Sequence, residues 1–116
     1  MQKLIINIGG DMLKEVKEVF EDPSKGKPNT HTIYLKTSQD LYEMLSPKRL
    51  ELLRYIIEHQ NEKKSISELA SELKRKQEAV SRDSNVLMKY NLIQKVREKR
   101  TVYLKALYGS LVINLA

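Results

Sequence analysis

The chain has 116 residues, no cysteine, and a formal net charge of +6 at pH 7 from 21 Lys and Arg against 15 Asp and Glu. The lack of cysteine excludes a disulfide framework, a thiolate zinc site and a cysteine nucleophile. No window approaches the ~20 apolar residues of a membrane span, and the apolar segment at residues 1–8 is too short for a secretory signal, so we expect a cytoplasmic protein with no membrane contact.

The first part of the chain predicts a strand, a helix, a loop and a second strand. Residues 2–8 are apolar and branched and end at a glycine pair, which is typical of a strand. Apolar residues recur at helical spacing within residues 11–22, which predicts a helix. Residues 23–29 contain prolines and a glycine but no apolar side chain, which predicts a loop, and residues 31–37 alternate as a strand does.

Cap residues mark the starts of the next three helices. Thr37 or Ser38 precedes a short helix that ends near residue 45, and Ser46 precedes a helix that begins with a proline and ends near residue 60. Ser65 and Glu68 have the spacing of a capping box, which opens another short helix. The apolar spacing predicts inward positions at Leu50, Leu53, Tyr55, Ile56 and Ile57 in the longer helix and at Ile66, Leu69, Ala70 and Leu73 in the last.

A fourth helix is predicted from about residue 77 to residue 90, after the polar interruption Lys74–Lys76. Asn91 suits its end, because asparagine adopts the left-handed conformation that closes a helix more readily than most residues. The buried side of this helix is predicted to be Ala79, Val80, Val86 and Leu87.

The C-terminal part predicts a hairpin and a last strand. Residues 92–96 and 101–105 are strand-like and are joined by the charged segment Arg97–Arg100. Tyr108–Ser110 is predicted to interrupt the chain before an apolar strand at 111–115.

The charge is unevenly divided along the chain. Residues 1–45 carry 6 Lys and Arg against 7 Asp and Glu, whereas residues 46–116 carry 15 against 8. Within residues 74–105 alone the count is 10 against 3. A basic excess confined to one part of a chain indicates a surface that faces a polyanion.

The order of elements after residue 45 is helix, short capped helix, turn, longer helix and hairpin, which is the order of a winged helix-turn-helix. We therefore expect an α+β fold: a three-helix core with a β-hairpin wing, an N-terminal β-α-β extension and a C-terminal strand. The longer helix would enter the major groove of double-stranded DNA, where its polar face would read base edges. The base-reading candidates are Gln77, Glu78, Ser81, Arg82 and Asn85, and the candidates for DNA-backbone contacts in the turn and wing are Lys74, Arg75, Lys76, Lys95, Arg97, Lys99 and Arg100.

Two parts of the sequence resemble known proteins. Residues 66–93, from Ile-Ser-Glu-Leu-Ala-Ser-Glu-Leu through Ala-Val-Ser-Arg-Asp to Asn-Leu-Ile, resemble the MarR-type winged-helix regulators. Residues 38–53, Ser-x-Asp-Leu followed by Leu-Ser-Pro-Lys-Arg-Leu-Glu-Leu-Leu, are similar to a group of small archaeal and bacterial proteins described by inference as DNA-binding transcriptional regulators. The resemblance covers about residues 33–115 and is specific in the Pro-Lys-Arg-Leu and Ser-Arg-Asp segments.

The resemblance implies roles for residues of the longer helix. Val80 would be a buried anchor, Arg82 would face DNA, and Asp83 would orient or pair with a neighbouring basic group. Two positions depart from the family pattern: Asn91 replaces the usual glycine at the helix end, and Ser84 stands where an apolar core residue is usual. Ser84 therefore either weakens the packing of this helix or marks a contact with a polar group.

The sequence predicts no enzyme, no catalytic residue, no metal site and no cofactor. His31 and His59 lie in different predicted elements with no carboxylate cluster around them. The pair Gly26–Lys27 lacks the upstream glycine and the hydroxyl residue of a phosphate-binding loop. The acidic pairs Glu15–Glu18 and Asp40–Glu43 have only the spacing of a helix surface, which does not favour general acid–base chemistry.

We expect a sequence-specific transcriptional regulator, a repressor or autoregulator, that binds double-stranded DNA through residues 46–116 as a homodimer. Residues 1–45 are expected to serve in dimerisation or in binding a protein partner. The strands at 2–8 and 111–115 are expected to contribute to a sheet or interface outside the DNA-reading unit. Two alternatives remain open: an antitoxin-like autoregulator with a protein partner at its N-terminal part, and a winged helix used as a protein-interaction module.

Overall fold

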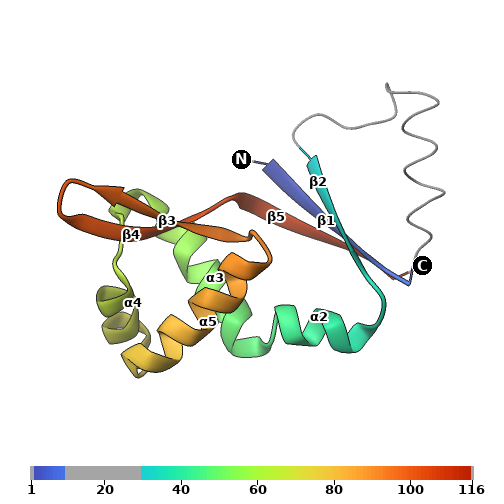
Figure 1. The fold of residues 1–116 in the computed structure, drawn as a ribbon, viewed down its shortest axis with the longest axis horizontal. Coiled ribbons are helices and arrows are strands. Elements are labelled where there is room, and N and C mark those ends of the chain that lie inside the picture. Colours follow the sequence, from blue (N-terminus) through green and yellow to red (C-terminus); the bar gives the residue numbers. More distant parts are fainter. Residues whose placement is uncertain (1, 10–29, 116) are drawn as a thin grey trace. The chain divides into compact units, whose positions relative to one another are not determined.

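The computed structural model describes residues 2–9 and 30–115 (Figure 1). Within these residues it is an α+β protein with four α-helices, one short 3-10 helix and five strands in two sheets. The helix expected at 11–22 and the loop expected at 23–29 lie outside the described residues. No helix in the described ranges is long and apolar enough to cross a bilayer.

The chain divides into two compact units. Residues 1–41 together with 108–116 form the first, the sheet unit, and residues 42–107 form the second, the helical unit. The C-terminal strand therefore belongs to the same unit as the N-terminal strands, whereas the sequence assigned it to residues 46–116. The reason is that its hydrogen-bonded partner is the first strand of the chain.

The sheet unit contains a three-stranded parallel sheet in the order β2-β1-β5. The strands predicted near the two ends of the chain are thus confirmed, and they pair with each other in a sheet outside the helical unit. The strands are β1 (Gln2–Ile8), β2 (Thr30–Leu35) and β5 (Tyr108–Asn114).

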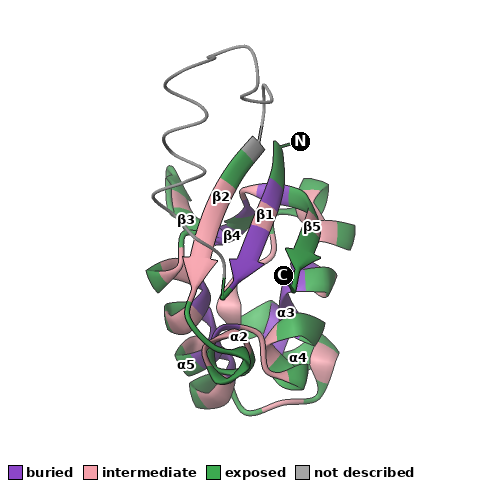
Figure 2. Cartoon of the chain, turned by 90° about the vertical axis from the view of Figure 1, so that its right-hand side faces the viewer, coloured by how far each residue is buried: buried purple, intermediate pink, exposed green. Residues whose placement is uncertain are grey.

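The central strand β1 is the most buried strand of this sheet (Figure 2). Leu4 and Ile6 are fully buried, as expected for a parallel strand with a neighbour on each side. Asn7 accepts a hydrogen bond at Oδ1 from Nδ2 of Asn114 at 2.8 Å, which joins the ends of β1 and β5.

The beginning of β5 differs from the prediction. Tyr108–Ser110 was expected to interrupt the chain, but these residues are the first three of the strand. The register passes from Gln2 opposite Tyr108 to Lys3 opposite Ser110, so Gly109 is one extra residue without a partner. A bulge of this kind lets a strand continue through a residue that weakens regular pairing.

The helix α2 (Ser38–Met44) lies where the chain passes from the sheet unit to the helical unit. Thr37 Oγ1 accepts from the Asp40 amide, and Asp40 Oδ2 accepts from the Thr37 amide, both at 3.2 Å. Thr37, rather than Ser38, is therefore the cap of this helix, because its side chain satisfies a free amide of the first turn.

Two helices of the helical unit begin at the caps predicted from the sequence, Ser46 and Ser65. Ser46 Oγ accepts from the amide of Arg49 at 3.4 Å. The capping box of Ser65 and Glu68 is present, with both hydrogen bonds at 3.2 Å. The elements are α3 (Pro47–Glu58), the 3-10 helix η2 (Gln60–Glu62), α4 (Ile66–Leu73), α5 (Gln77–Lys89) and the antiparallel strands β3 (Ile93–Glu98) and β4 (Thr101–Ala106).

Removal of the Ser65 hydroxyl should destabilise the protein. Ser65→Ala leaves the Glu68 amide without its side-chain acceptor, and such a change at a helix cap costs about 0.5–2 kcal/mol. Urea unfolding followed by circular dichroism measures the loss. Ser67, exposed in the same helix, gives the control Ser67→Ala, which should change stability by less than about 0.5 kcal/mol. Equal losses for the two variants would contradict the role of Ser65.

Left-handed residues close the two helices that precede the hairpin. Asn91 has φ of 59°, and the following amide, that of Leu92, donates to the Leu87 carbonyl at 3.0 Å, which confirms the predicted helix end. Lys74 closes α4 in the same way, with φ of 56° and the Arg75 amide donating back into the last turn at 2.9 Å. The sequence did not predict this second closure, because lysine is not typical of that conformation.

The buried faces of α3 and α5 differ from the predicted ones. Leu50, expected in the core, is 47 % exposed, and Ala79 and Val86 are only half buried. The reason is that polar side chains share the inner faces: Arg49, for example, continues the face of α3 with a side chain that is only 19 % exposed. The buried positions are Leu52, Leu53 and Ile56 on α3 and Val80, Asp83, Ser84 and Leu87 on α5.

Candidate nucleic-acid interface

The outer face of α5 carries exposed polar side chains. Glu78, Arg82 and Asn85 are exposed and lie at i, i+4 and i+7, so they project from one side of the helix. Gln77 is exposed in the same first turn, and Ser81 is half buried. Within the described part of the chain, the four exposed side chains make no ion pair and no side-chain hydrogen bond. Their donors and acceptors are therefore available to a ligand.

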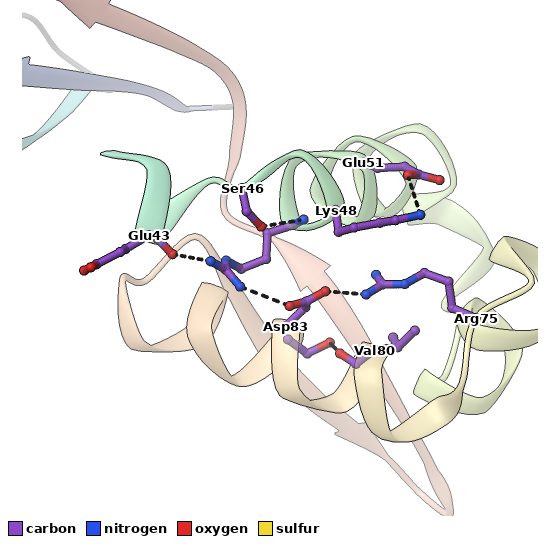
Figure 3. Close-up of polar contacts among 9 residues, drawn as sticks. Glu43, Ser46, Lys48, Glu51, Arg75, Val80 and Asp83 are labelled. Carbon is purple, nitrogen blue, oxygen red and sulfur yellow. Dashed lines mark hydrogen bonds and ion pairs between the residues drawn. The ribbon is translucent and has the colours of Figure 1, made fainter. Parts of the chain in front are cut away.

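The inner face of α5 carries a buried carboxylate between two arginines. Asp83 Oδ1 accepts from Arg49 Nη1 at 3.2 Å, and Asp83 Oδ2 accepts from Arg75 Nη2 at 2.5 Å. Arg49 comes from the first turn of α3 and also donates from Nη2 to the carbonyl oxygen of Glu43 at 2.7 Å. We call Arg49, Arg75 and Asp83 the Asp83 network (Figure 3). The prediction that Asp83 pairs with a neighbouring basic group is confirmed.

Arg75 is not available for the phosphate contact predicted from the sequence. Its side chain is only 12 % exposed, and its guanidinium is bound to the buried carboxylate of Asp83. A phosphate could compete for Arg75 only by taking from the buried carboxylate one of its two arginine partners, which is unfavourable. Arg75 therefore has an internal role, unlike the lysines on either side of it.

The position of Ser84 in the core is explained by a hydrogen bond within the helix. Ser84 is fully buried, and its hydroxyl donates to the carbonyl oxygen of Val80 at 2.7 Å. The buried hydroxyl is thereby satisfied one turn earlier in the same helix. Of the two interpretations of this departure from the family pattern, the contact with a polar group is the one observed.

The other residues predicted to contact the DNA backbone are all exposed. In the described residues none of them forms an ion pair with an acidic side chain. They therefore give two groups of unpaired positive charge, one before α5 and one on the hairpin. The first group is Lys74 and Lys76, and the second is Lys95 and Arg97 on β3 with Lys99 and Arg100 in the two-residue turn.

The hairpin is attached to the rest of the helical unit close to its turn, at Glu98, the last residue of β3. Lys63 Nζ lies 2.8 Å from Glu98 Oε2 and 5.7 Å from the ring centroid of Tyr103. Tyr103 is buried, and its hydroxyl donates to Glu98 Oε1 at 3.2 Å. The hydrogen bond from Lys63 is the main cause that lowers the pKa of Glu98. These contacts restrict the direction in which the basic turn can point.

A model of the HVO_A0114 family matches residues 44–113. The chain belongs to the HVO_A0114 family. The match begins at the last residue of α2 and ends one residue before the end of β5. The outer face of α5, the Asp83 network and the basic hairpin all lie inside it. No curated protein matches the chain.

Two anchoring residues of this site, Arg49 and Lys63, were not predicted from the sequence. Arg49 is 34 positions from Asp83 in the chain, and no local pattern links them. One signal could have indicated Arg49: it lies three and four positions before Leu52 and Leu53, so it shares their buried face. A charge at such a position needs an internal partner. No pattern in the sequence around Lys63 indicates that this lysine contacts the hairpin.

A second ionic cluster joins η2 to α4. Lys64 Nζ lies 3.2 Å from Glu62 Oε2 and 3.0 Å from Glu72 Oε1. Tyr55 also donates from its hydroxyl to Glu72 Oε1 at 3.0 Å. The hydrogen bonds from Lys64 are the main cause that lowers the pKa of both carboxyl groups below the usual 4.5.

This cluster predicts a loss of stability in acid. Because the pKa values of Glu62 and Glu72 are lower in the folded state, their stabilisation is complete above the unfolded value and is lost as the pH falls through the folded values. We expect the thermal midpoint to fall as the pH drops below the ordinary glutamate value of 4.5, and Lys64→Met to make that fall shallower. Lys48→Met, at an exposed pair 4.0 Å apart, is the control. An unchanged pH dependence in Lys64→Met would contradict this role.

The two histidines lie in separate surroundings. The His31 ring lies 6.1 Å from that of Tyr108, and the His59 ring lies 4.2 Å from that of Tyr55. In the ranges that the structure describes, no group of three or more His, Asp or Glu side chains is placed to hold a metal ion.

Proposed function

We propose that the helical unit is a winged helix-turn-helix that binds double-stranded DNA, and that the protein is a transcriptional regulator of the kind its resemblance to MarR-type proteins implies. In this proposal α4 and α5 are the helix-turn-helix pair, α3 supports them, and β3 with β4 is the wing. The observation that carries the proposal is the outer face of α5, whose polar side chains are exposed and unpaired within the described residues.

The residue types on this face suit the edges of base pairs. Arginine makes two hydrogen bonds to guanine, and glutamine or asparagine makes two to adenine, so Arg82, Gln77 and Asn85 have the chemistry of direct readout. Glu78 would accept from the amino group of cytosine. Ser81 is half buried and would reach only a base edge that comes close to the helix.

The basic residues on either side of α5 suit the DNA backbone. Lys74 and Lys76 precede the helix, and the turn of the hairpin contains Lys99 and Arg100. A helix in a major groove roughly 12 Å wide has a phosphate strand on each side, so cations before the helix and on a wing would each meet phosphates. These contacts would position the protein without reading sequence.

We further propose that the regulator acts as a homodimer and is a repressor or an autoregulator. One recognition helix reads only a few base pairs, whereas twofold symmetry doubles the site and its specificity. Light scattering on the full chain, free and bound to a selected duplex, measures the mass of the assembly. A 1:1 complex at saturation would contradict the dimer but not DNA binding.

The experiment that tests the proposal is selection of bound fragments from a random pool of duplex DNA, followed by titration of the selected duplex. Arg82→Ala should weaken binding to it by about 1–3 kcal/mol, because one two-bond contact to a base is lost. The matched control is Arg54→Ala, which removes an arginine from α3 whose side chain is 80 % exposed.

Two outcomes would oppose the proposal. If Arg82→Ala binds the selected duplex as tightly as the parent does, α5 is not the recognition helix. If the parent retains no duplex at low salt, the protein does not bind DNA, and a winged helix that binds other proteins becomes the better interpretation.

A further inference from the structure

The Asp83 network joins three elements at one buried carboxylate. Arg49 belongs to α3, Arg75 to the turn before α5, and Asp83 to the middle of α5. The exposed fractions of the three side chains are 19 %, 12 % and 10 %. Figure 3 shows Arg75 reaching toward α5 from the turn, with Asp83 pointing inward to meet it.

The position of this network fixes the rotation of α5 about its own axis. Successive residues on a helix are about 100° apart, so the inward direction of Asp83 determines the outward direction of its neighbour Arg82. If α5 rotated about its axis by the angle between successive residues, Asp83 would lose its contacts with both arginines. Arg82 would then no longer lie on the outer face. The network and the outer face are therefore two consequences of one orientation.

Apolar packing alone would hold α5 less specifically. Val80 and Leu87 are fully buried on the same inner face, but apolar contacts are not directional. Hydrogen bonds between a guanidinium and a carboxylate have a defined geometry, and Arg49 and Arg75 contact different oxygens of Asp83. A buried ionic group is a poor source of stability compared with apolar side chains of similar size. What the buried network adds is therefore a fixed orientation of α5.

We infer that the Asp83 network sets the DNA-sequence selectivity of this protein by fixing the rotation of α5. The inference rests on the proposed DNA-binding function and assigns a part in the selectivity of that site to residues that do not touch DNA. Arg49, Arg75 and Asp83 are positioning residues. Their loss reduces the discrimination between duplexes and leaves the sequence-independent attraction to phosphates in place.

The test replaces the whole network by apolar residues of similar size, Arg49→Met, Arg75→Met and Asp83→Leu in one variant. Such replacements are often neutral or stabilising, so the variant should unfold cooperatively with a thermal midpoint near that of the parent. It removes two positive charges and one negative charge, a net loss of one. Arg54→Met also removes one positive charge, from an exposed side chain, and is the matched control.

The measured quantity is the ratio of two dissociation constants, that for a scrambled duplex divided by that for the selected duplex. We expect the triple variant to lower this ratio about tenfold or more, because a single well-formed base contact discriminates by roughly 5–150-fold. Its affinity for the scrambled duplex should stay within about twofold of the Arg54→Met value, since both lose one charge. A ratio equal to that of Arg54→Met would overturn the inference.

A second variant keeps the inference testable if the triple variant does not fold. Arg75→Lys keeps the positive charge but loses the planar group that fixes the geometry of the contact. It should lower the ratio by a smaller factor at unchanged affinity for the scrambled duplex, and an unchanged ratio would overturn the inference. If the parent binds no duplex, the proposed function fails. If the parent discriminates and both variants match it, only the positioning role fails.

Discussion

Replacing Asp83 by alanine should lower the free energy of unfolding by about 3–5 kcal/mol, because two arginines would then remain buried without their common carboxylate. A small domain is stable by only about 5–15 kcal/mol, so the variant should lose a substantial fraction of its stability. Urea denaturation of parent and variant measures the difference. Glu51→Ala, which removes a carboxylate that is 53 % exposed, is the control and should change stability by less than about 1 kcal/mol.

Replacing all three residues of the Asp83 network should restore the stability that Asp83→Ala removes. When Arg49 and Arg75 are also replaced by methionine and Asp83 by leucine, no buried charge is left without a partner. The stability should return to within about 1–2 kcal/mol of the parent. If the triple variant were as unstable as Asp83→Ala, the loss would come from packing around Asp83 and not from its charge.

Removing the positive charges of the hairpin should weaken binding to every duplex by a similar factor. The variant carries Arg97→Gln, Lys99→Gln and Arg100→Gln, all at exposed positions. Each lost phosphate contact reduces the magnitude of the slope of log affinity against log salt concentration by about 0.9, so the loss of three contacts reduces it by about 2.7. Near 0.15 M salt, this corresponds to a loss of affinity on the order of 100-fold. Fluorescence anisotropy at several salt concentrations gives both quantities.

The control for this variant is an equal loss of charge elsewhere. Lys36→Gln, Lys48→Gln and Arg54→Gln remove three exposed cations that lie outside α5 and the hairpin. Their combined effect on the salt slope should be well below that of the hairpin variant, because the proposal gives these three side chains no phosphate contact and therefore no counterions to release. Equal slopes for the two variants would mean that net charge attracts DNA and that the hairpin has no specific part.

The order of helices and their starting points could be predicted from the sequence because the signals are local. Ser46, Ser65 and Glu68 cap helices through residues three positions away, so a short window of sequence contains both partners. Asn91 closes α5 by its own tolerance of the left-handed conformation. The exposed face of α5 was predictable for the same reason, since helical spacing places its polar residues together.

The inner face of α5 could not be predicted from apolar spacing alone. Asp83 and Ser84 lie on it, and a search for apolar residues moves the expected face toward Ala79 and Val86. The sequence shows that Asp83 and Arg75 are charged, but it does not show that they face each other. That requires the packing of α3 against α5, which brings Arg49 to the same carboxylate.

The sequence by itself determined the helices, their caps, the hairpin and the basic character of the second half, because each depends on residues within a few positions of one another. Only the tertiary structure decided which charges are internal and which strands pair. Asn114 meets Asn7 across 107 positions of chain, and Arg49 meets Asp83 across 34. Contacts between residues so far apart in the chain depend on how whole helices and strands pack against one another. The type of one residue in such a contact does not identify the other.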